Sequence, residues 1–361
     1  MNRIWIFFHL LTGFIFFTAC DEKSVTPIVE HEIKSSIIND TFEETNVVIY
    51  YYPAFEVMVA YKAEIEGQPL EFSEVNDFPV IMQDQLGNQY NIFGEVMSGP
   101  NQGAQLEFIN QMKGYWFAIA SFYPEATLYY ENTIKERLEI NGTNDWLVPS
   151  EYIVRGALPN AIPAINSPRF ETINGSIGEF NKENNDLSTL SLVIKYKETV
   201  RVYPERTLEF HEIVNDQIDD LKFTLSYCPL TSTGTCWIKT DNDFYVSGLL
   251  YNANLILSDW STGNLWSQIY GKSINGTNSG QVCEKLPSIE MNSQGKVNLV
   301  GTAEVLSLED ELPSESPYAG YKIRESVGYP VSYLDDRLPN KERVLAIIID
   351  GKAKVYRTFD F

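Results

Sequence analysis

A set of short motifs recurs along the chain at one nearly constant spacing. Three motifs each return 176 residues later: 37–40 (IIND) as 213–216 (IVND), 51–53 (YYP) as 227–229 (YCP), and 87–90 (GNQY) as 263–266 (GNLW). After one inserted residue, three glycines return 177 residues later: Gly94, Gly99 and Gly103 as Gly271, Gly276 and Gly280. Common turn dipeptides explain any one match, but they do not explain the shared spacing. The sequence therefore predicts an internal duplication.

The end of the chain supplies a further match. Residues 344–356 (VLAIIIDGKAKVY) parallel residues 190–203 (LSLVIKYKETVRVY), which read as strand, turn and strand ahead of the second copy. The first copy has no such hairpin before it. We therefore expect a circularly permuted duplication, in which the C-terminal hairpin completes the N-terminal repeat and removes a sheet edge. The expected boundaries are 33–131 for the first pseudo-repeat, about 188–290 for the second, and about 342–361 for the closing hairpin.

Alternating apolar residues predict a mainly β fold. Runs such as 46–51, 222–227 and 243–247 alternate and are separated by turn-forming Gly, Asn and Asp. Aromatic residues make up 13% of the chain and suit pleated, half-buried surfaces. Helical periodicity is scarce, and its best candidate covers 114–123 and is stopped by Pro124. We expect an α+β protein, mainly β, with few short helices.

The N-terminus resembles the signal of a bacterial lipoprotein. Arg3 precedes an apolar run at 4–17, and small residues stand just before Cys20. In this pattern the signal (1–19) is removed and Cys20 becomes the lipidated N-terminus of a tether (20–32). The alternative is a short membrane anchor with an incidental cysteine, but the run is shorter than the roughly 20 residues that span a bilayer. We expect the lipid bilayer as a partner through Cys20, and a location at the outer membrane of a Gram-negative cell envelope, on its periplasmic or surface face.

The charge balance excludes one class of partner. The chain has 27 Lys and Arg against 49 Asp and Glu, a formal charge of −22. This charge repels a phosphate backbone, so we expect no nucleic-acid partner. No Walker loop, dinucleotide-binding glycine pattern or nucleophile elbow occurs, which argues against nucleotide and serine-hydrolase chemistry.

Seven sequence blocks follow one another in the later part of the chain. They are 151–156 (EYIVRG), 211–216 (HEIVND), 227–230 (YCPL), 247–252 (SGLLYN), 262–268 (TGNLWSQ), 329–332 (YPVS) and 336–339 (DRLP). Together they resemble the bacterial family called domain of unknown function 3179. The resemblance runs from about 143 to 361 as a family core, and the region of Trp116 is similar to the family's other repeat. It implies kinship and assigns no activity.

The resemblance bears on the Cys-Pro-Leu motif. Similar family members carry Cys-Pro-Leu-Cys there, and some carry selenocysteine in the second position, which implies redox chemistry. This chain has Thr231 at that position. A vicinal dithiol is therefore absent, which argues against a two-cysteine exchange at this motif.

His211 and Cys228 are the leading candidates for a catalytic pair. His9 lies in the signal and His31 in the tether, so imidazole chemistry in the folded part must use His211. Two adjacent strands would bring His211 to Cys228, where an imidazolium lowers the pKa of a thiol and Thr231 would donate a hydrogen bond to the thiolate. In the alternative, His211 bonds a turn and Cys228 packs as a small apolar residue. The first pseudo-repeat lacks such a Cys/His site.

Two further cysteines leave the pairing open. Cys228 and Cys236 flank a loop and could form a disulfide, or Cys236 could act as a resolving thiol. Cys236 could also pair with Cys283, which would leave Cys228 free. With Cys20 lipidated, an odd number of thiols remains, so at least one is unpaired.

A metal site is an alternative use of the same side chains. His211, Cys228, Cys236 and Asp216 offer imidazole, thiolate and carboxylate ligands that suit zinc or copper. No recognised ligand spacing is present. We therefore predict no cofactor, with zinc or copper as the alternative.

Two functional hypotheses follow from the sequence. The leading one is an exported lipoprotein that acts as a thiol-dependent redox or related enzyme through Cys228 and His211. The competing one is a non-catalytic surface binding or scaffold lipoprotein in which these residues are structural. The sequence names no substrate, redox partner or protein partner.

Overall fold

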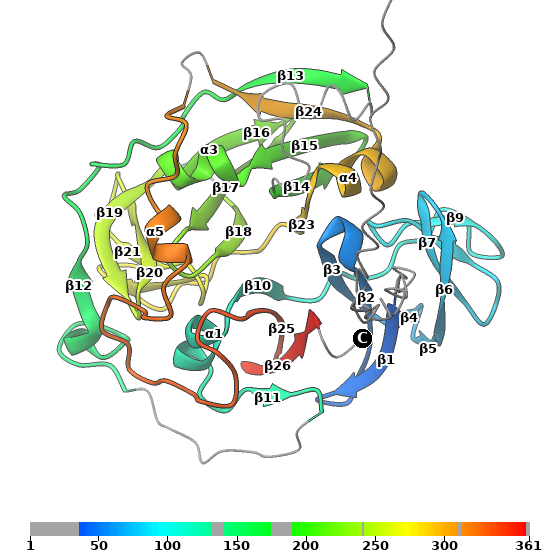
Figure 1. Cartoon of the computed structure of the whole chain (residues 1–361), viewed down its shortest axis with the longest axis horizontal. Helices are drawn as coiled ribbons and strands as arrows, with labels where there is room; N and C mark the ends of the chain where they lie inside the picture. The colour runs from blue at the N-terminus through cyan, green and yellow to red at the C-terminus, as the bar shows by residue number, and fades with distance from the viewer. Residues whose placement is uncertain (1–35, 131–140, 175–189, 240–241, 309–311, 359–361) are drawn as a thin grey trace, which may run out of the picture. The chain divides into compact units, whose positions relative to one another are not determined.

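The alternating runs of the sequence form strands, and the prediction of a mainly β fold is confirmed (Figure 1). The computed structural model describes residues 36–130, 141–174, 190–239, 242–308 and 312–358. These residues belong to one unit that extends from Ile33 to Phe361. None of the described helices is long and apolar enough to cross a membrane. The predicted signal, Cys20 and the tether lie outside the described residues.

The N-terminal part contains one three-stranded and one four-stranded antiparallel sheet, β1–β2–β3 and β6–β7–β8–β9, with β4 paired to β5. The bounds are Ser36–Phe42, Thr45–Tyr52 and Val57–Lys62 for β1 to β3, Glu64–Ile65 and Gln68–Pro69 for β4 and β5, and Phe72–Asp77, Val80–Asp84, Gln89–Tyr90 and Val96–Ser98 for β6 to β9.

The C-terminal part contains a similar pair of sheets, β16–β17–β18 and β19–β20–β21–β22, and β12 adds to the edge of the second. The bounds are Ile153–Arg155 for β12, Ile213–Ile218, Leu221–Cys228 and Thr233–Ile238 for β16 to β18, and Phe244–Tyr251, Asn254–Asp259, Leu265–Ser267 and Lys272–Asn275 for β19 to β22.

Two hairpins, β14–β15 and β25–β26, form the centres of the remaining sheets. Their orders are β13–β24–β15–β14–β23 and β10–β25–β26–β11, and in each the second hairpin strand has a parallel partner, β24 or β11. The bounds are Gln111–Tyr115, Thr127–Leu128, Arg343–Ile349 and Lys352–Arg357 for β10, β11, β25 and β26, and Arg169–Asn174, Ser191–Tyr196, Thr199–Pro204, Ile289–Met291 and Thr302–Ser307 for β13, β14, β15, β23 and β24.

Helices are few and short in the described chain. They are α1 (Trp116–Phe122), α3 (Glu205–His211), α4 (Ser293–Gly295) with a π-helix at Lys296–Val300, α5 (Ala319–Lys322), and 3-10 turns at Pro53–Phe55 and Ser150–Tyr152. The expected helix at 114–123 is confirmed as α1, which ends before Pro124 because a proline cannot continue the hydrogen-bond ladder.

The C-terminal hairpin lies between α1 and the N-terminal sheet. Val344, Ala346 and Ile348 of β25 pack in the apolar cluster that contains α1. Leu345 and Ile347 pack in the cluster formed by β1 to β3. Because successive side chains of a strand point to opposite faces, β25 is buried on both sides.

Side-chain contacts repeat between the two parts of the chain. Asn39 exchanges two hydrogen bonds of 2.8 Å with the backbone of Phe72, and Asn215 bonds the backbone of Phe244 in the same way at 2.9 and 3.1 Å. Each asparagine ties the first strand of its three-stranded sheet to the first strand of the following sheet. The backbone bond from Cys283 N to the carbonyl of Gly271 likewise repeats the bond from Leu106 N to the carbonyl of Gly94.

The two hairpins also make matching contacts. Tyr356 of β26 donates a 2.8 Å hydrogen bond to Asp40 of β1, and Tyr203 of β15 donates one to Asp216 of β16. The C-terminal hairpin therefore stands to β1 as the β14–β15 hairpin stands to β16. We propose the permuted duplication as the origin of this arrangement, supported by these matched contacts.

The two parts meet at a buried ionic cluster. Glu290 of β23 accepts a 2.6 Å bond from Arg343 of β25 and forms a 2.7 Å ion pair with Lys113 of β10. Burial alone would raise the pKa of Glu290, but these two cations hold it below its usual range. Glu205, which begins α3, shows the opposite behaviour, because burial and the charge of Glu290 raise its pKa. We infer an ionised Glu290 beside a protonated Glu205 at neutral pH.

This assignment predicts different costs for two matched substitutions. We expect Glu290→Gln to lower the free energy of unfolding by about 3–5 kcal/mol, because it leaves buried cations without their counter-charge. Glu205→Gln replaces one neutral planar group by another, and we expect a change below about 1 kcal/mol. Urea unfolding followed by circular dichroism measures both. Equal losses would contradict the assigned charge states.

Candidate functional site

The Cys228 thiol lies at the end of β17, where the chain turns towards β18. Its partner across the hairpin is Thr233, and its side chain is 1% exposed. The sulfur packs beneath the turn that joins β19 to β20, with the carbonyl oxygen of Ala253 3.8 Å away. Two hairpin ends therefore enclose the thiol.

Burial dominates the chemistry of this thiol. It raises the pKa of Cys228 to about 11, and the nearby charge of Glu212 acts in the same direction. The hydroxyl of Thr231 and the backbone N–H groups of Thr231 and Leu255 act in the opposite direction and would stabilise a thiolate. Since the raising effects prevail, the thiol is protonated at neutral pH and is not an activated nucleophile in this conformation.

The carboxyl of Glu212 is the acid–base group whose charge acts on Cys228. Glu212 follows α3 with a φ of 56°, a left-handed conformation that is costly for a residue with a side chain. Its N–H bonds the Leu208 carbonyl at 2.7 Å, and its carboxylate accepts a 2.9 Å hydrogen bond from the hydroxyl of Tyr318. Burial raises the pKa of Glu212 to about 7, so it can accept or release a proton near neutral pH.

Tyr318 and Tyr321, in the segment that carries α5, pack against the apolar cluster that contains Cys228. The hydroxyl of Tyr321 donates a 2.9 Å hydrogen bond to the Leu230 carbonyl in the turn after Cys228. Lys322 in the same segment forms an ion pair with Glu209 of α3, which links the segment to that helix. Because the sulfur is buried, a reactant reaches it only when part of this cover moves.

The imidazole of His211 is engaged with another part of the chain. Its Nδ1 lies 2.9 Å from the carbonyl oxygen of Pro163. Glu212, the next residue in the chain, is among the groups that act on the Cys228 thiol. The predicted pairing of His211 with Cys228 stays a prediction, and the structure adds Glu212 as a site residue that sequence reasoning missed.

Thr231 belongs to a buried polar network behind the thiol. Its hydroxyl lies 2.8 Å from that of Thr233 and accepts a 2.9 Å bond from the amide of Asn254. The same amide donates a 2.6 Å bond to Gln268. These bonds hold the turn after Cys228 against β20. Gln268 is the last residue of the block 262–268, one of the seven blocks that resemble the family, so the sequence offered a signal for this residue.

The structure describes all three cysteines of the folded part as free thiols. Across the β17–β18 hairpin, Cys236 lies opposite Leu225, whereas Cys228 lies opposite Thr233. Because side chains alternate along a strand, the two sulfurs lie on opposite faces of the sheet, where they can neither form a disulfide nor exchange one. Cys283 is likewise a free thiol, so the expected disulfide or resolving role of these residues finds no geometric support.

The four candidate metal ligands are not brought together. Asp216 is held by Arg201 at 2.7 Å and by Tyr203, on the face of the sheet away from Cys228. In the described part of the chain, no group of three or more His, Cys, Asp or Glu side chains is placed to hold a metal ion.

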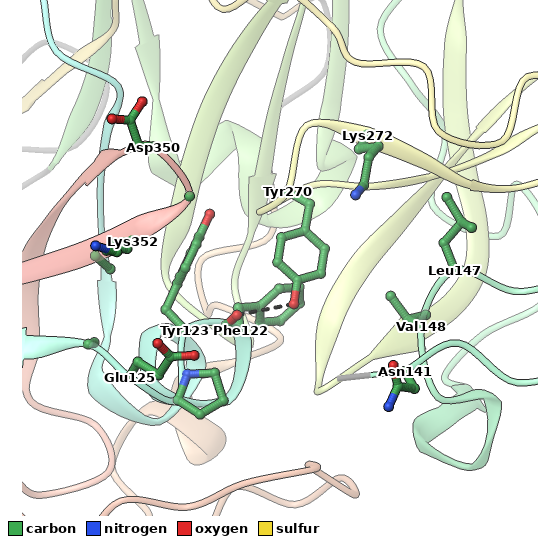
Figure 2. A pocket seen from close by; sticks show the side chains of 14 residues that line it. Phe122, Tyr123, Glu125, Asn141, Leu147, Val148, Tyr270, Lys272, Asp350 and Lys352 are labelled. Atoms are coloured by element: carbon green, nitrogen blue, oxygen red, sulfur yellow. Dashed lines mark hydrogen bonds between the residues drawn. The ribbon is translucent and has the colours of Figure 1, made fainter. Parts of the chain in front are cut away.

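An open cleft lies on the other side of α1 (Figure 2). Its volume is about 670 Å³, and the end of α1, the turn of the β25–β26 hairpin and the start of β22 line it. Its polar lining includes Tyr123, Glu125, Tyr270, Lys272, Asp350 and Lys352. Sequence reasoning singled out none of these residues.

The end of α1 separates this cleft from the thiol. Phe122 lines the cleft and accepts a 3.1 Å hydrogen bond from Tyr270 through its carbonyl oxygen. The carbonyl of the preceding residue, Ser121, accepts a 3.2 Å bond from Asn252 in the turn above Cys228. The cleft and the Cys228 site are therefore linked through two successive residues of α1, Ser121 and Phe122.

A family model described as a protein of unknown function (DUF3179) matches residues 28–126 and 159–360. The chain belongs to the DUF3179 family. The match extends the resemblance found in the later part of the chain to the N-terminal part as well. No curated protein and no solved structure shows significant similarity to the chain.

The neighbours of Cys228 predict how two adjacent substitutions change its reactivity. At pH 8 we expect Cys228 to react with iodoacetamide at least about 100-fold more slowly than an unfolded-chain cysteine, because a pKa near 11 instead of 9 gives about that factor and burial of the sulfur slows the reaction further. Glu212→Gln removes a charge that raises this pKa, so labelling should become several-fold faster. His211→Gln should leave the rate unchanged.

Mass spectrometry that resolves labelling at each cysteine separates Cys228 from Cys236 and Cys283. A slower reaction in the His211→Gln variant would instead support the imidazole as the group that activates the thiol.

Proposed function

We propose that this DUF3179 protein is a lipid-anchored binding protein of the bacterial cell envelope, and that the cleft beside α1 is its ligand site. The observation that carries the proposal is the contrast between the two candidate places. The cleft is open and lined by tyrosines and charged groups, whereas the Cys228 thiol is buried and protonated. A volume of about 670 Å³ lies within the range of roughly 300–1,000 Å³ typical of small-molecule sites.

The lining of the cleft supports a polar ligand. Tyr123 and Tyr270 provide amphipathic rings, which contribute contact area and a hydroxyl at little conformational cost. Lys272, Glu125 and Asp350 supply charge of both signs within a chain of formal charge −22. An apolar ligand such as an acyl chain would remove water from these charged groups without offering them a hydrogen bond.

Filling the cleft tests this function. The exposed Leu147 lines the cleft, and Leu147→Trp should occupy it, whereas Leu86 lies in a distant turn with nearly the same exposure, 40% against 43%. We expect ligand-observed NMR with a library of small polar fragments to give hits that Leu147→Trp removes and Leu86→Trp keeps. A library without hits, or hits that survive in both variants, would refute the cleft as the ligand site.

The lipid anchor is a separate part of the proposal and rests on the signal-like N-terminus. We expect the chain expressed with its signal to incorporate a radiolabelled fatty acid and to partition into detergent. Cys20→Ser should abolish both, because it removes the acceptor sulfur. Cys228→Ser is the matched control and should retain both. Labelling that survives in Cys20→Ser would contradict the anchor.

Thiol chemistry at Cys228 is a second candidate, and the buried Glu212 is the observation that favours it. After the segment with α5 moves, the thiol proton would pass to Glu212 and the thiolate would attack a substrate disulfide. A new S–S bond forms as the old one breaks, and the leaving thiolate takes up the proton. Incubation of the folded protein with an aromatic disulfide, with Cys228→Ser as the control, tests this step. Absence of a mixed disulfide at Cys228 would remove the candidate.

A further inference from the structure

A second, smaller cleft occupies the place that corresponds to the first in the other part of the chain. Its volume is about 350 Å³, and Phe93, Glu95 and Lys195 are among its lining residues. The spacing of 177 residues that relates Gly94 to Gly271 places Phe93 at the position of Tyr270, and Glu95 at the position of Lys272. Both clefts therefore lie between the start of a matched loop and one of the two hairpins.

An ion pair between two lining residues spans the smaller cleft. Lys195 of β14 donates hydrogen bonds to both carboxylate oxygens of Glu95, one of them at 2.6 Å. The same ammonium lies 5.1 Å from the ring centre of Phe93. The ion pair joins the two walls, so neither Glu95 nor Lys195 offers a free charge to a ligand.

The larger cleft cannot close in this way. The spacing that relates Tyr203 to Tyr356 places Ile348 at the position of Lys195, and Ile348 is buried and apolar. Glu95 is replaced by Lys272, which forms no ion pair in the described part of the chain and lies 5.9 Å from the ring centre of Tyr270. Among the described residues, Lys272 is therefore a cation on the wall of an open cleft without an ion-pair partner.

The other charges of the cleft limit what this lysine can bind. Lys352 is already paired with Glu43 at 2.7 Å, so it is not a second free cation. Glu125 and Asp350 line the cleft and repel a ligand with many negative charges. A ligand that fits has one anionic group and neutral polar groups elsewhere.

We propose that the larger cleft binds a short saccharide that carries a carboxylate. The carboxylate pairs with Lys272, and the C–H face of a sugar ring packs on the aromatic surface formed by Tyr123 and Tyr270, whose rings pack edge to face with their centroids 6.0 Å apart (Figure 2). The carboxylates of Glu125 and Asp350 accept hydrogen bonds from sugar hydroxyls. This inference rests on the proposed binding function and names the ligand class of that site.

A panel of two- to four-unit oligosaccharides tests the ligand class. Each member contains a uronate or sialate residue and is paired with its neutral counterpart, and binding to the full mature chain is measured by isothermal titration calorimetry. We expect an acidic member to bind and its neutral counterpart to bind at least about ten-fold more weakly, the factor typical of a lost charge-assisted hydrogen bond.

Two matched lysine variants locate the effect. Lys272→Met should lower the affinity for the acidic saccharide to the affinity for its neutral counterpart. Lys197→Met alters an exposed lysine of the smaller cleft and should leave binding unchanged. Thermal unfolding checks that both variants fold.

Three results would overturn the inference. They are a panel without binding, equal binding of acidic and neutral members, and binding that Lys272→Met does not change. If no oligosaccharide binds but Leu147→Trp still removes the binding of fragments, the result supports the proposed binding function and excludes a saccharide as the ligand. Dipeptides are measured for comparison. If they bind and Lys272→Met abolishes their binding, the ligand of the cleft is a peptide instead.

Discussion

The N-terminal part of this chain does not complete its own core, because the strand between its sheet and its helix comes from the C-terminus. β25 pairs with β10 so that Ile347 lies beside Gln111. Five successive residues, 344–348, are buried on the two faces of that strand. Each large apolar side chain buried there contributes about 1.5–3 kcal/mol. The position of α1 depends on this strand pairing, because α1 packs against β25. The cleft and the turn above Cys228 depend on it through α1, which lines the cleft and bonds to Asn252 in that turn.

The predicted repeat rests on motifs whose side chains make similar contacts in the two parts of the chain. Asn39 and Asn215 each join two sheets through paired backbone bonds, so their spacing follows directly from the fold. The helix ending before Pro124 was visible for the same reason, since a local rule determines it. Features set by local geometry could be predicted, and so could the family.

The candidate site was less visible because tertiary contacts create it. Glu212 becomes a buried acid only when Tyr318, about a hundred residues later, covers it. The Cys228 pKa rises for the same reason, and no spacing rule contains that information. Lys272 is different, because a comparison of the two predicted repeats at the 177-residue spacing places it at the position of Glu95, with the opposite charge.

The closing hairpin has a consequence for how such a chain is made. Synthesis presents the N-terminus first, yet β10 pairs at Gln111 with Ile347, a residue that follows more than two hundred residues later. Contacts this distant in sequence slow folding, because the chain must close a long loop before burial compensates the lost entropy. The N-terminal part would thus reach its final structure only after the last strand of the chain has been synthesised.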